Sequence, residues 1–109
     1  MSGLNQRLYP NPLKSIDSAS FTGSYQTLGI PLETACRVVK LTNNSTVLVT
    51  VSWDGINDHE ILPSGSFILI DVSSNRETSN ICEISQGTQF LVKGIAGTGS
   101  VYLSSYFAR

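Results

Sequence analysis

The sequence predicts an all-β fold, an antiparallel β-sandwich or jelly-roll-like domain of about eight strands. The first observation behind this prediction is the alternation of apolar and polar residues in short runs, most clearly in residues 47–52, Val-Leu-Val-Thr-Val-Ser. The second is the regular spacing of clusters rich in Gly, Pro, Asn, Asp and Ser between these runs. The third is that no window keeps a helical period, which excludes the crossover helices that a parallel sheet needs.

Residues 37–62 organise the predicted sheet. Within residues 38–42, Val39 and Leu41 alternate with polar neighbours, which predicts a strand with one buried face. Residues 43–45, Asn-Asn-Ser, are predicted to form a polar turn, because Asn tolerates positive φ and its side chain bonds its own backbone. After the next strand, Asp54-Gly55 predicts a tight connection to a third strand.

The remaining strands follow from the same pattern. Strands are expected at residues 18–28, 35–42, 46–53, 56–62, 66–72, 81–85, 89–95 and 100–108. Residues 66–72 are almost continuously apolar, which predicts a central strand or one buried on both faces. The residues predicted to be buried are Val39, Leu41, Val47, Val49, Val51, Ile68, Ile70, Phe90, Val92, Val101 and Leu103.

Residues 1–17 are predicted to form an extended N-terminal arm, and residues 18–109 the sandwich domain. Pro10 and Pro12 each fix a φ angle and remove a backbone donor, which favours an extended segment over a helix. The arm is too apolar for a purely solvated tail, so its large side chains are expected to bind a partner or to fold back on the domain. The candidate partner-binding residues are Leu4, Leu8, Tyr9 and Leu13.

Composition narrows the function classes. The chain has 109 residues, and its charged share of 14% is low against a usual value of about 25%. With a net charge of −1 and no basic run, nucleic-acid binding is not expected. No stretch approaches the ~18 apolar residues of a membrane span, and the N-terminus lacks a signal-peptide core, so we expect synthesis in the cytoplasm. Cys36 and Cys82 are predicted to be reduced, buried residues of strands.

No catalytic or metal motif is present. Polar side chains cluster at residues 54–60, but they lack the ligand offsets of a calcium loop, so no metal and no cofactor are expected. His59 is the single histidine, and no Gly-x-Ser-x-Gly accompanies it, so the chain is not expected to be an enzyme. The glycines of residues 94–99 precede no helix, which excludes a phosphate loop. Trp53 is expected to cap the core; the alternative is a sugar-stacking platform formed with tyrosines.

Several segments, taken in order, resemble small all-β accessory proteins of tailed-bacteriophage virions. The resemblance covers about residues 18–108. It is carried by Leu-Thr-Asn-Asn-Ser (41–45), Val-Thr-Val-Ser-Trp-Asp-Gly (49–55), Ile-Leu-Pro-Ser-Gly-Ser (61–66), Gln-Gly-Thr-Gln-Phe-Leu-Val-Lys-Gly (86–94) and Gly-Thr-Gly-Ser-Val-Tyr-Leu-Ser (97–104).

The resemblance implies a non-enzymatic structural protein of the virion and transfers no catalytic residue. A capsid decoration or cement protein is expected first, bridging neighbouring capsid subunits with a rigid domain and an arm that can reach about 55 Å. Its partners would be capsid or other virion proteins and further copies of itself, since many copies add avidity. The alternatives are a neck or tail adaptor, and a carbohydrate- or receptor-binding module of a tail or fibre.

Overall fold

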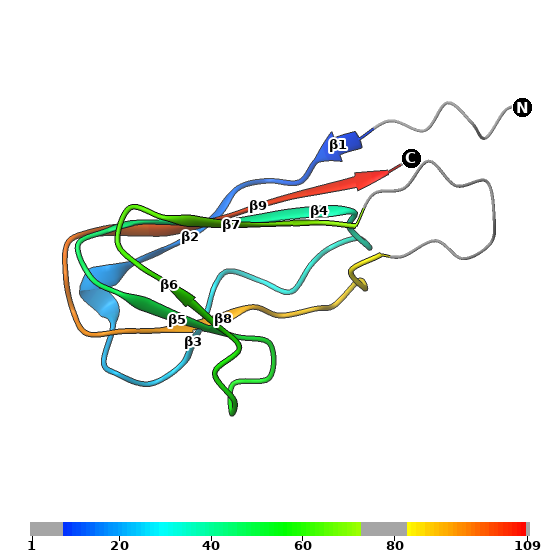
Figure 1. The fold of residues 1–109 in the computed structure, drawn as a ribbon. Helices are drawn as coiled ribbons and strands as arrows, with labels where there is room; N and C mark the ends of the chain where they lie inside the picture. The colour runs from blue at the N-terminus through cyan, green and yellow to red at the C-terminus, as the bar shows by residue number, and fades with distance from the viewer. Residues whose placement is uncertain (1–7, 73–82, 109) are drawn as a thin grey trace, which may run out of the picture.

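Nine strands are present in the described part of the chain, residues 8–72 and 83–108, in the computed structural model (Figure 1). They are β1 (Leu8–Pro10), β2 (Lys14–Asp17), β3 (Gln26–Thr27), β4 (Val38–Ser45), β5 (Val49–Ser52), β6 (Glu60–Leu62), β7 (Phe67–Asp71), β8 (Leu91–Lys93) and β9 (Gly99–Ala108). A single 3-10 turn, η2 (Ser18–Ser20), interrupts them, and no α-helix occurs within the described ranges.

The strands form two antiparallel sheets that pack face to face (Figure 1). The five-stranded sheet has the order β1-β9-β4-β7, and β2 pairs with β9 beside β1. The four-stranded sheet has the order β3-β8-β5-β6. The long strand β9 pairs with β4 over eight residues and holds both N-terminal strands on its other edge. The prediction of an antiparallel β-sandwich is therefore confirmed.

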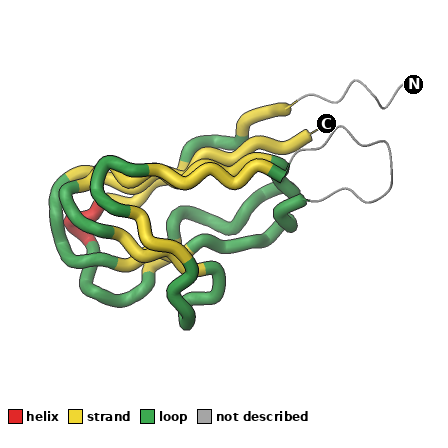
Figure 2. The backbone as a smooth tube through the Cα atoms, in the orientation of Figure 1, coloured by secondary structure: helices red, strands yellow, loops and turns green. Residues whose placement is uncertain are grey.

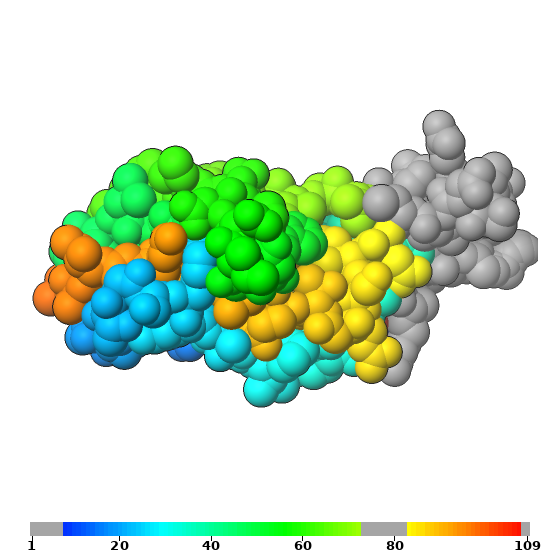
Figure 3. Space-filling model, turned by 90° about the horizontal axis from the view of Figure 1, so that it is seen from below, coloured from blue at the N-terminus to red at the C-terminus, as the bar shows by residue number. Residues whose placement is uncertain are grey.

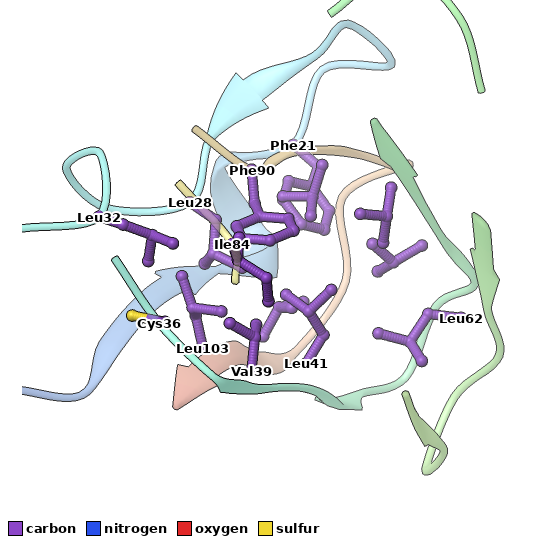
Figure 4. Close-up of a cluster of buried hydrophobic side chains, with 14 residues drawn as sticks. Phe21, Leu28, Leu32, Cys36, Val39, Leu41, Leu62, Ile84, Phe90 and Leu103 are labelled. Atoms are coloured by element: carbon purple, nitrogen blue, oxygen red, sulfur yellow. The ribbon is translucent and has the colours of Figure 1, made fainter. Parts of the chain in front are cut away.

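The core lies between the two sheets, where apolar side chains of both inner faces meet (Figure 4). Of the predicted core residues, Val39, Leu41, Val49, Val51, Phe90, Val92, Val101 and Leu103 are buried. Val47, Ile68 and Ile70 are only partly buried and pack against this cluster from its margin. Alternation along β4, β5 and β9 thus selects the buried face correctly.

The other half of the core is closed by two irregular segments, residues 28–36 and 84–90, that run side by side (Figure 2). They continue the β3–β8 pairing through backbone bonds such as Leu28 N–H to Phe90 O at 2.8 Å and Leu32 N–H to Thr88 O at 2.9 Å. These bonds end in the isolated bridge between Cys36 and Ile84. The pattern analysis missed the buried residues that these segments and their neighbours contribute, namely Phe21, Leu28, Leu32, Leu62 and Ile84. Cys36 is buried as expected, and Cys82 lies outside the described residues.

The turn predicted at residues 43–45 is wrong, because these residues are the last three of β4. Asn43 is completely buried, and its side-chain amide donates to the carbonyls of Val47 and Leu62, both at 2.8 Å. Its Oδ1 accepts from the backbone N–H and the hydroxyl of Ser45. The polar side chain therefore stays in the strand, because it bonds the loop that follows and the facing sheet.

The central position predicted for residues 66–72 is also wrong, since β7 is the edge strand of the five-stranded sheet. Its side chains alternate between half-buried and exposed positions, with Phe67 and Leu69 59% and 54% exposed. The apolar run reflects an exposed apolar face rather than burial on both faces. Lys40 covers part of that face, with its Nζ 4.7 Å from the centre of the Phe67 ring.

The boundary expected at residue 18 needs correction for residues 8–17, because β1 and β2 both pair with β9. Lys14 and Ser18 are buried, and Ile16 packs against the core cluster. The two prolines do not prevent this pairing: Pro10 ends the edge strand β1, and Pro12 falls between the two strands. The first seven residues of the predicted arm lie outside the described residues.

Candidate functional site

Exposed apolar side chains lie on the side of the five-stranded sheet that faces away from the four-stranded sheet; Figure 1 shows the two layers. We call this side the outer face. Across it, β7 places Phe67 beside Thr42 of β4, and Thr42 lies beside Tyr102 of β9. In the adjacent row, Leu69 lies beside Lys40. The residues used below as the outer face are Leu8, Leu13, Lys40, Phe67, Leu69, Tyr102 and Tyr106.

Three of the four residues predicted to bind a partner lie in or directly beside the N-terminal strands. Leu8 in β1 is 50% exposed, and Leu13, which immediately precedes β2, is 61% exposed. Tyr9 is 37% exposed and stacks on Phe107 of β9, with ring centres 5.7 Å apart. Leu4 lies outside the described residues. Leu8, Tyr9 and Leu13 are thus accessible although β1 and β2 belong to the sheet.

The outer face offers a macromolecular partner large, exposed side chains that all lie on the same sheet. Apolar patches that extend over several strands are uncommon on monomeric proteins and often mark interaction sites. Its charge is sparse: Lys40 is the single cation among the residues assigned to it, and that ammonium lies against an aromatic ring. The surface therefore suits an apolar contact better than recognition of a charged ligand.

In the polar cluster at residues 54–60, Asp54 bonds to groups of its own loop and to Ser52 beside it. The Asp54 carboxylate accepts the backbone N–H groups of Ile56 at 2.8 Å and Asn57 at 2.9 Å, and it also accepts the Ser52 hydroxyl. These donors, with the Asn57 N–H first, hold the pKa of Asp54 well below its ordinary value. The tight connection expected at Asp54-Gly55 is instead a seven-residue loop, residues 53–59, between β5 and β6.

Trp53 has features of both roles that the sequence allowed, a cap on the core and an exposed platform for sugar stacking. Its ring meets the buried Phe90 edge-on at 4.7 Å, as a core cap would, yet 39% of the residue is exposed. Its backbone N–H donates to Nδ1 of His59 at 3.0 Å, so this imidazole nitrogen is used in the loop. His59, the only histidine of the chain, therefore has a structural role in the loop.

A second polar cluster joins Asp58 of the same loop to Tyr25 and Lys93. The Tyr25 hydroxyl donates to Asp58 Oδ1, and the Lys93 ammonium lies 3.1 Å from the same oxygen and 4.6 Å from the Tyr25 ring centre. Desolvation, followed by the bond to Asp58, raises the pKa of Tyr25 to about 12. The Tyr25 and Lys93 donors lower the pKa of Asp58. The three groups satisfy one another and leave little charge for a ligand.

Beside this cluster is an open hollow of about 550 Å³ on the face seen in Figure 3, where blue, green and orange segments meet. Leu48 and Ile95 on its wall are 54% and 72% exposed. Its lining residues are Gly23, Thr46, Val47, Leu48, Thr50, Lys93, Gly94 and Ile95. Lys93 is the only ionisable group among them, and it is already paired. The sequence analysis did not find this hollow, because its residues come from three loops and from the strands β5 and β8.

Within residues 8–72 and 83–108, no group of three or more His, Cys, Asp or Glu side chains is placed to hold a metal ion. The same part of the chain contains no helix long and apolar enough to cross a membrane. The glycines at 94–99 form the connection from β8 to β9, where Gly99 has a φ of +90° that favours glycine. Independence from metals and cofactors stays a prediction.

Comparison with known proteins finds a structural neighbour but no matching family. A scan against protein-family models found no match, and a search of curated proteins found none either. Among solved structures, the crystal structure of SPBc2 prophage-derived protein YomS is similar, with 10% sequence identity and a TM-score of 0.40. The alignment covers 93% of this chain and 96% of that chain. We draw no functional conclusion from this similarity.

Proposed function

We propose that this chain is a non-enzymatic structural protein of a tailed-bacteriophage virion, in the role of a capsid decoration or cement protein. In this role it bridges neighbouring capsid subunits in the virion after synthesis in the host cytoplasm. The resemblance of residues 18–108 to phage accessory proteins supports the proposal. It is also supported by the architecture, a rigid sandwich whose N-terminal strands run along one edge of the larger sheet.

The observation that carries the proposal is the exposed apolar outer face. Leu13 and Leu8 at the β9 edge are 61% and 50% exposed, and Phe67 at the β7 edge is 59% exposed. Burial of such side chains stabilises an interface by about 25 cal/mol per Å² of apolar area. A contact repeated on every subunit of a lattice gains further from avidity, so each copy needs only a modest affinity.

The test is binding of the purified protein to particles that lack it. The double variant Leu8→Ser, Leu13→Ser removes apolar area at the β9 edge, and we expect at least a tenfold loss of occupancy, which corresponds to about 1.4 kcal/mol. The matched control is Ile61→Ser, because Ile61 is 62% exposed on the four-stranded sheet. Occupancy of the double variant equal to the wild type would refute attachment through these residues.

A carbohydrate-binding module is the second candidate, favoured by the 39% exposure of Trp53 beside a polar loop. Against it, the loop's Asp54 and His59 already bond to backbone groups of the same loop. Titration of the wild type and Trp53→Ala with host-surface glycans separates the two candidates. Glycan binding that is lost in Trp53→Ala would favour the module. For a cement protein, the wild type and the variant should respond to the glycans in the same way.

A neck or tail adaptor would share the exposed outer face but would assemble as a ring of fixed copy number. Labelling of the protein in intact particles distinguishes the two positions. A cement protein labels the capsid surface in many copies, whereas an adaptor labels one vertex. Label at a single vertex would replace the cement role with the adaptor role.

A further inference from the structure

His59 closes the base of the loop between β5 and β6, residues 53–59, which projects below the four-stranded sheet in Figure 1. Its backbone N–H donates to Val51 O at 2.9 Å, and its Nδ1 accepts the backbone N–H of Trp53 at 3.0 Å. Because a backbone amide can only donate, Nδ1 carries no proton in this geometry, and the neutral imidazole holds its proton on Nε2. The bond to Trp53 therefore exists only while His59 is neutral.

Protonation of the imidazole removes the acceptor of this bond. Both ring nitrogens of an imidazolium are donors, so the Trp53 N–H would face a second N–H. His59 is exposed, so protons reach it from the solvent. Histidine is also the side chain whose charge ordinarily changes between about pH 5 and pH 8. Mild acidification is thus sufficient to act on this one contact.

We propose that His59 is a pH-sensitive switch for the loop 53–59. The neutral imidazole holds the backbone of Trp53 in the position that sets its ring edge-on against Phe90, with ring centres 4.7 Å apart. The protonated imidazole releases that backbone, and the indole ring, already 39% exposed, moves further into solvent.

The tip of the loop keeps its own bonds over the same pH range. The Asp54 carboxylate accepts the backbone N–H groups of Asn57 and Ile56, which hold its pKa well below the ordinary value, so it stays ionised. Ser52 Oγ accepts the backbone N–H of Gly55 at 2.9 Å and does not titrate. Acidification therefore breaks the bond at the base of the loop and leaves the tip intact.

The charged groups around His59 come from the loop and from the neighbouring strand β8. Asp58 and Glu60 flank it in the chain, and Asp58 interacts with it electrostatically. The Lys93 ammonium of β8 lies 3.1 Å from Asp58 Oδ1, and the Tyr25 hydroxyl donates to the same oxygen. Asp58, with its lowered pKa, stays ionised, and Tyr25, with a pKa of about 12, stays neutral. Neither of them changes charge together with the imidazole.

The switch controls how the loop presents its apolar side chains. Ile56 at the tip is 82% exposed, and Trp53 lies at the base. A partner that contacts either side chain would bind in a pH-dependent manner. The inference does not depend on the virion role, and its tests use no particle, so failure of one proposal leaves the other intact.

The first experiment follows intrinsic fluorescence, since Trp53 is the only tryptophan of the chain. From pH 8 to pH 5 the emission maximum of the wild type should shift to longer wavelength, and quenching by acrylamide should increase. His59→Asn places an amide oxygen where Nδ1 lies and does not titrate, so it should keep the pH 8 spectrum throughout. His59→Ala has no acceptor and should show the shifted spectrum at both pH values.

The control is Glu60→Gln, which removes the adjacent carboxylate and should retain the transition of the wild type. A wild type without a transition would overturn the proposal, as would a transition of equal size in His59→Asn. Loss of the transition in Glu60→Gln would assign the titration to Glu60 and overturn it as well.

The second experiment needs no variant and is therefore independent of folding defects. Amide hydrogen exchange of the wild type is measured at pH 7 and pH 5 and corrected for the intrinsic rate at each pH. The protection of the Trp53 amide should fall about fivefold at pH 5, which corresponds to about 1 kcal/mol for one hydrogen bond. The amides of Ile56 and Asn57 keep the Asp54 carboxylate as acceptor and should not change. Equal losses at the three amides would contradict a switch located at His59.

Discussion

Asn43 illustrates how one buried polar residue joins the two layers of the sandwich. Its amide group donates to a carbonyl of the following loop and to the Leu62 carbonyl of β6, and its oxygen accepts two bonds from Ser45. All four bonding positions of the side chain are therefore used. A buried amide satisfied in this way stabilises one arrangement of the loop, because any other arrangement would leave polar atoms unpaired.

Substitution of Asn43 by Ala should destabilise the domain by about 1–3 kcal/mol, since it leaves the Val47 and Leu62 carbonyls without their donor. The matched control is Asn44→Ala, one residue along the same strand but exposed, for which we expect a change within about 0.5 kcal/mol. Urea denaturation of both variants measures the difference. Similar midpoints for the two variants would contradict the role assigned to Asn43.

The same residue shows why sequence patterns fail at buried polar positions. Three polar residues in succession favour a turn, and the bonds that keep Asn43 in the strand come from carbonyls four and nineteen residues away. Alternation in β4, β5 and β9 is local and was sufficient to predict the buried face. The outer face is an intermediate case. Leu8 and Leu13 were named from their apolar character, whereas Phe67 and Leu69 belong to the run 66–72, which was expected to be central or buried on both faces.

At the scale of elements, β2 is fixed to the irregular segment 28–36 by an ion pair. The Lys14 ammonium donates to Glu33 Oε1 at 2.6 Å, with the lysine side chain 6% and the glutamate side chain 35% exposed. The stem of Lys14 lies against Gly29, where an added Cβ would lie 2.7 Å from Lys14 Cβ. Burial of Leu28 and Leu32 thus depends on a segment without regular period, held by contacts distant in sequence. Patterns of period two could not predict it.

The ion pair predicts a dependence of stability on pH. The hydrogen bond from Lys14 is the main cause that lowers the pKa of Glu33. Because the pKa is lower in the folded state, this stabilisation is complete above the unfolded pKa and is lost as the pH falls through the folded value. Thermal unfolding between about pH 7 and about pH 3 should therefore show a smaller loss for Lys14→Met than for the wild type. Parallel curves would exclude the contribution.

The two partners of this pair should respond unequally to removal at neutral pH. Glu33→Ala leaves a buried ammonium without its acceptor and should cost about 1–3 kcal/mol, less than for a fully enclosed pair because water reaches the carboxylate. Lys14→Met keeps an apolar stem in the same place and leaves a carboxylate that water can solvate, so it should cost less. Chemical denaturation of the two variants at one pH gives the comparison. A larger loss for Lys14→Met would contradict this argument.

At the scale of the whole molecule, β9 is the strand on which the larger sheet is assembled. It pairs with β4 on one side and with β1 and β2 on the other, so the N-terminal and C-terminal parts of the chain meet there. A sheet in which β9 pairs with β1 and β2 depends on contacts between residues far apart in sequence. This explains why a boundary placed at residue 18 from local pattern alone separated β2 from its own sheet.

The last prediction concerns deletion of the N-terminal strands. A chain that begins at residue 18 loses the four residue pairs between β2 and β9, the contact of Ile16 with the core and the partner of Glu33. It also exposes the β9 edge as a new site for aggregation. We expect a loss of about 3–5 kcal/mol, a large share of the ~5–15 kcal/mol typical of a domain. The control begins at residue 8 and keeps both strands. If the two shortened chains melt at the same temperature, β2 contributes nothing to folding, and residues 8–17 act only as an attachment arm.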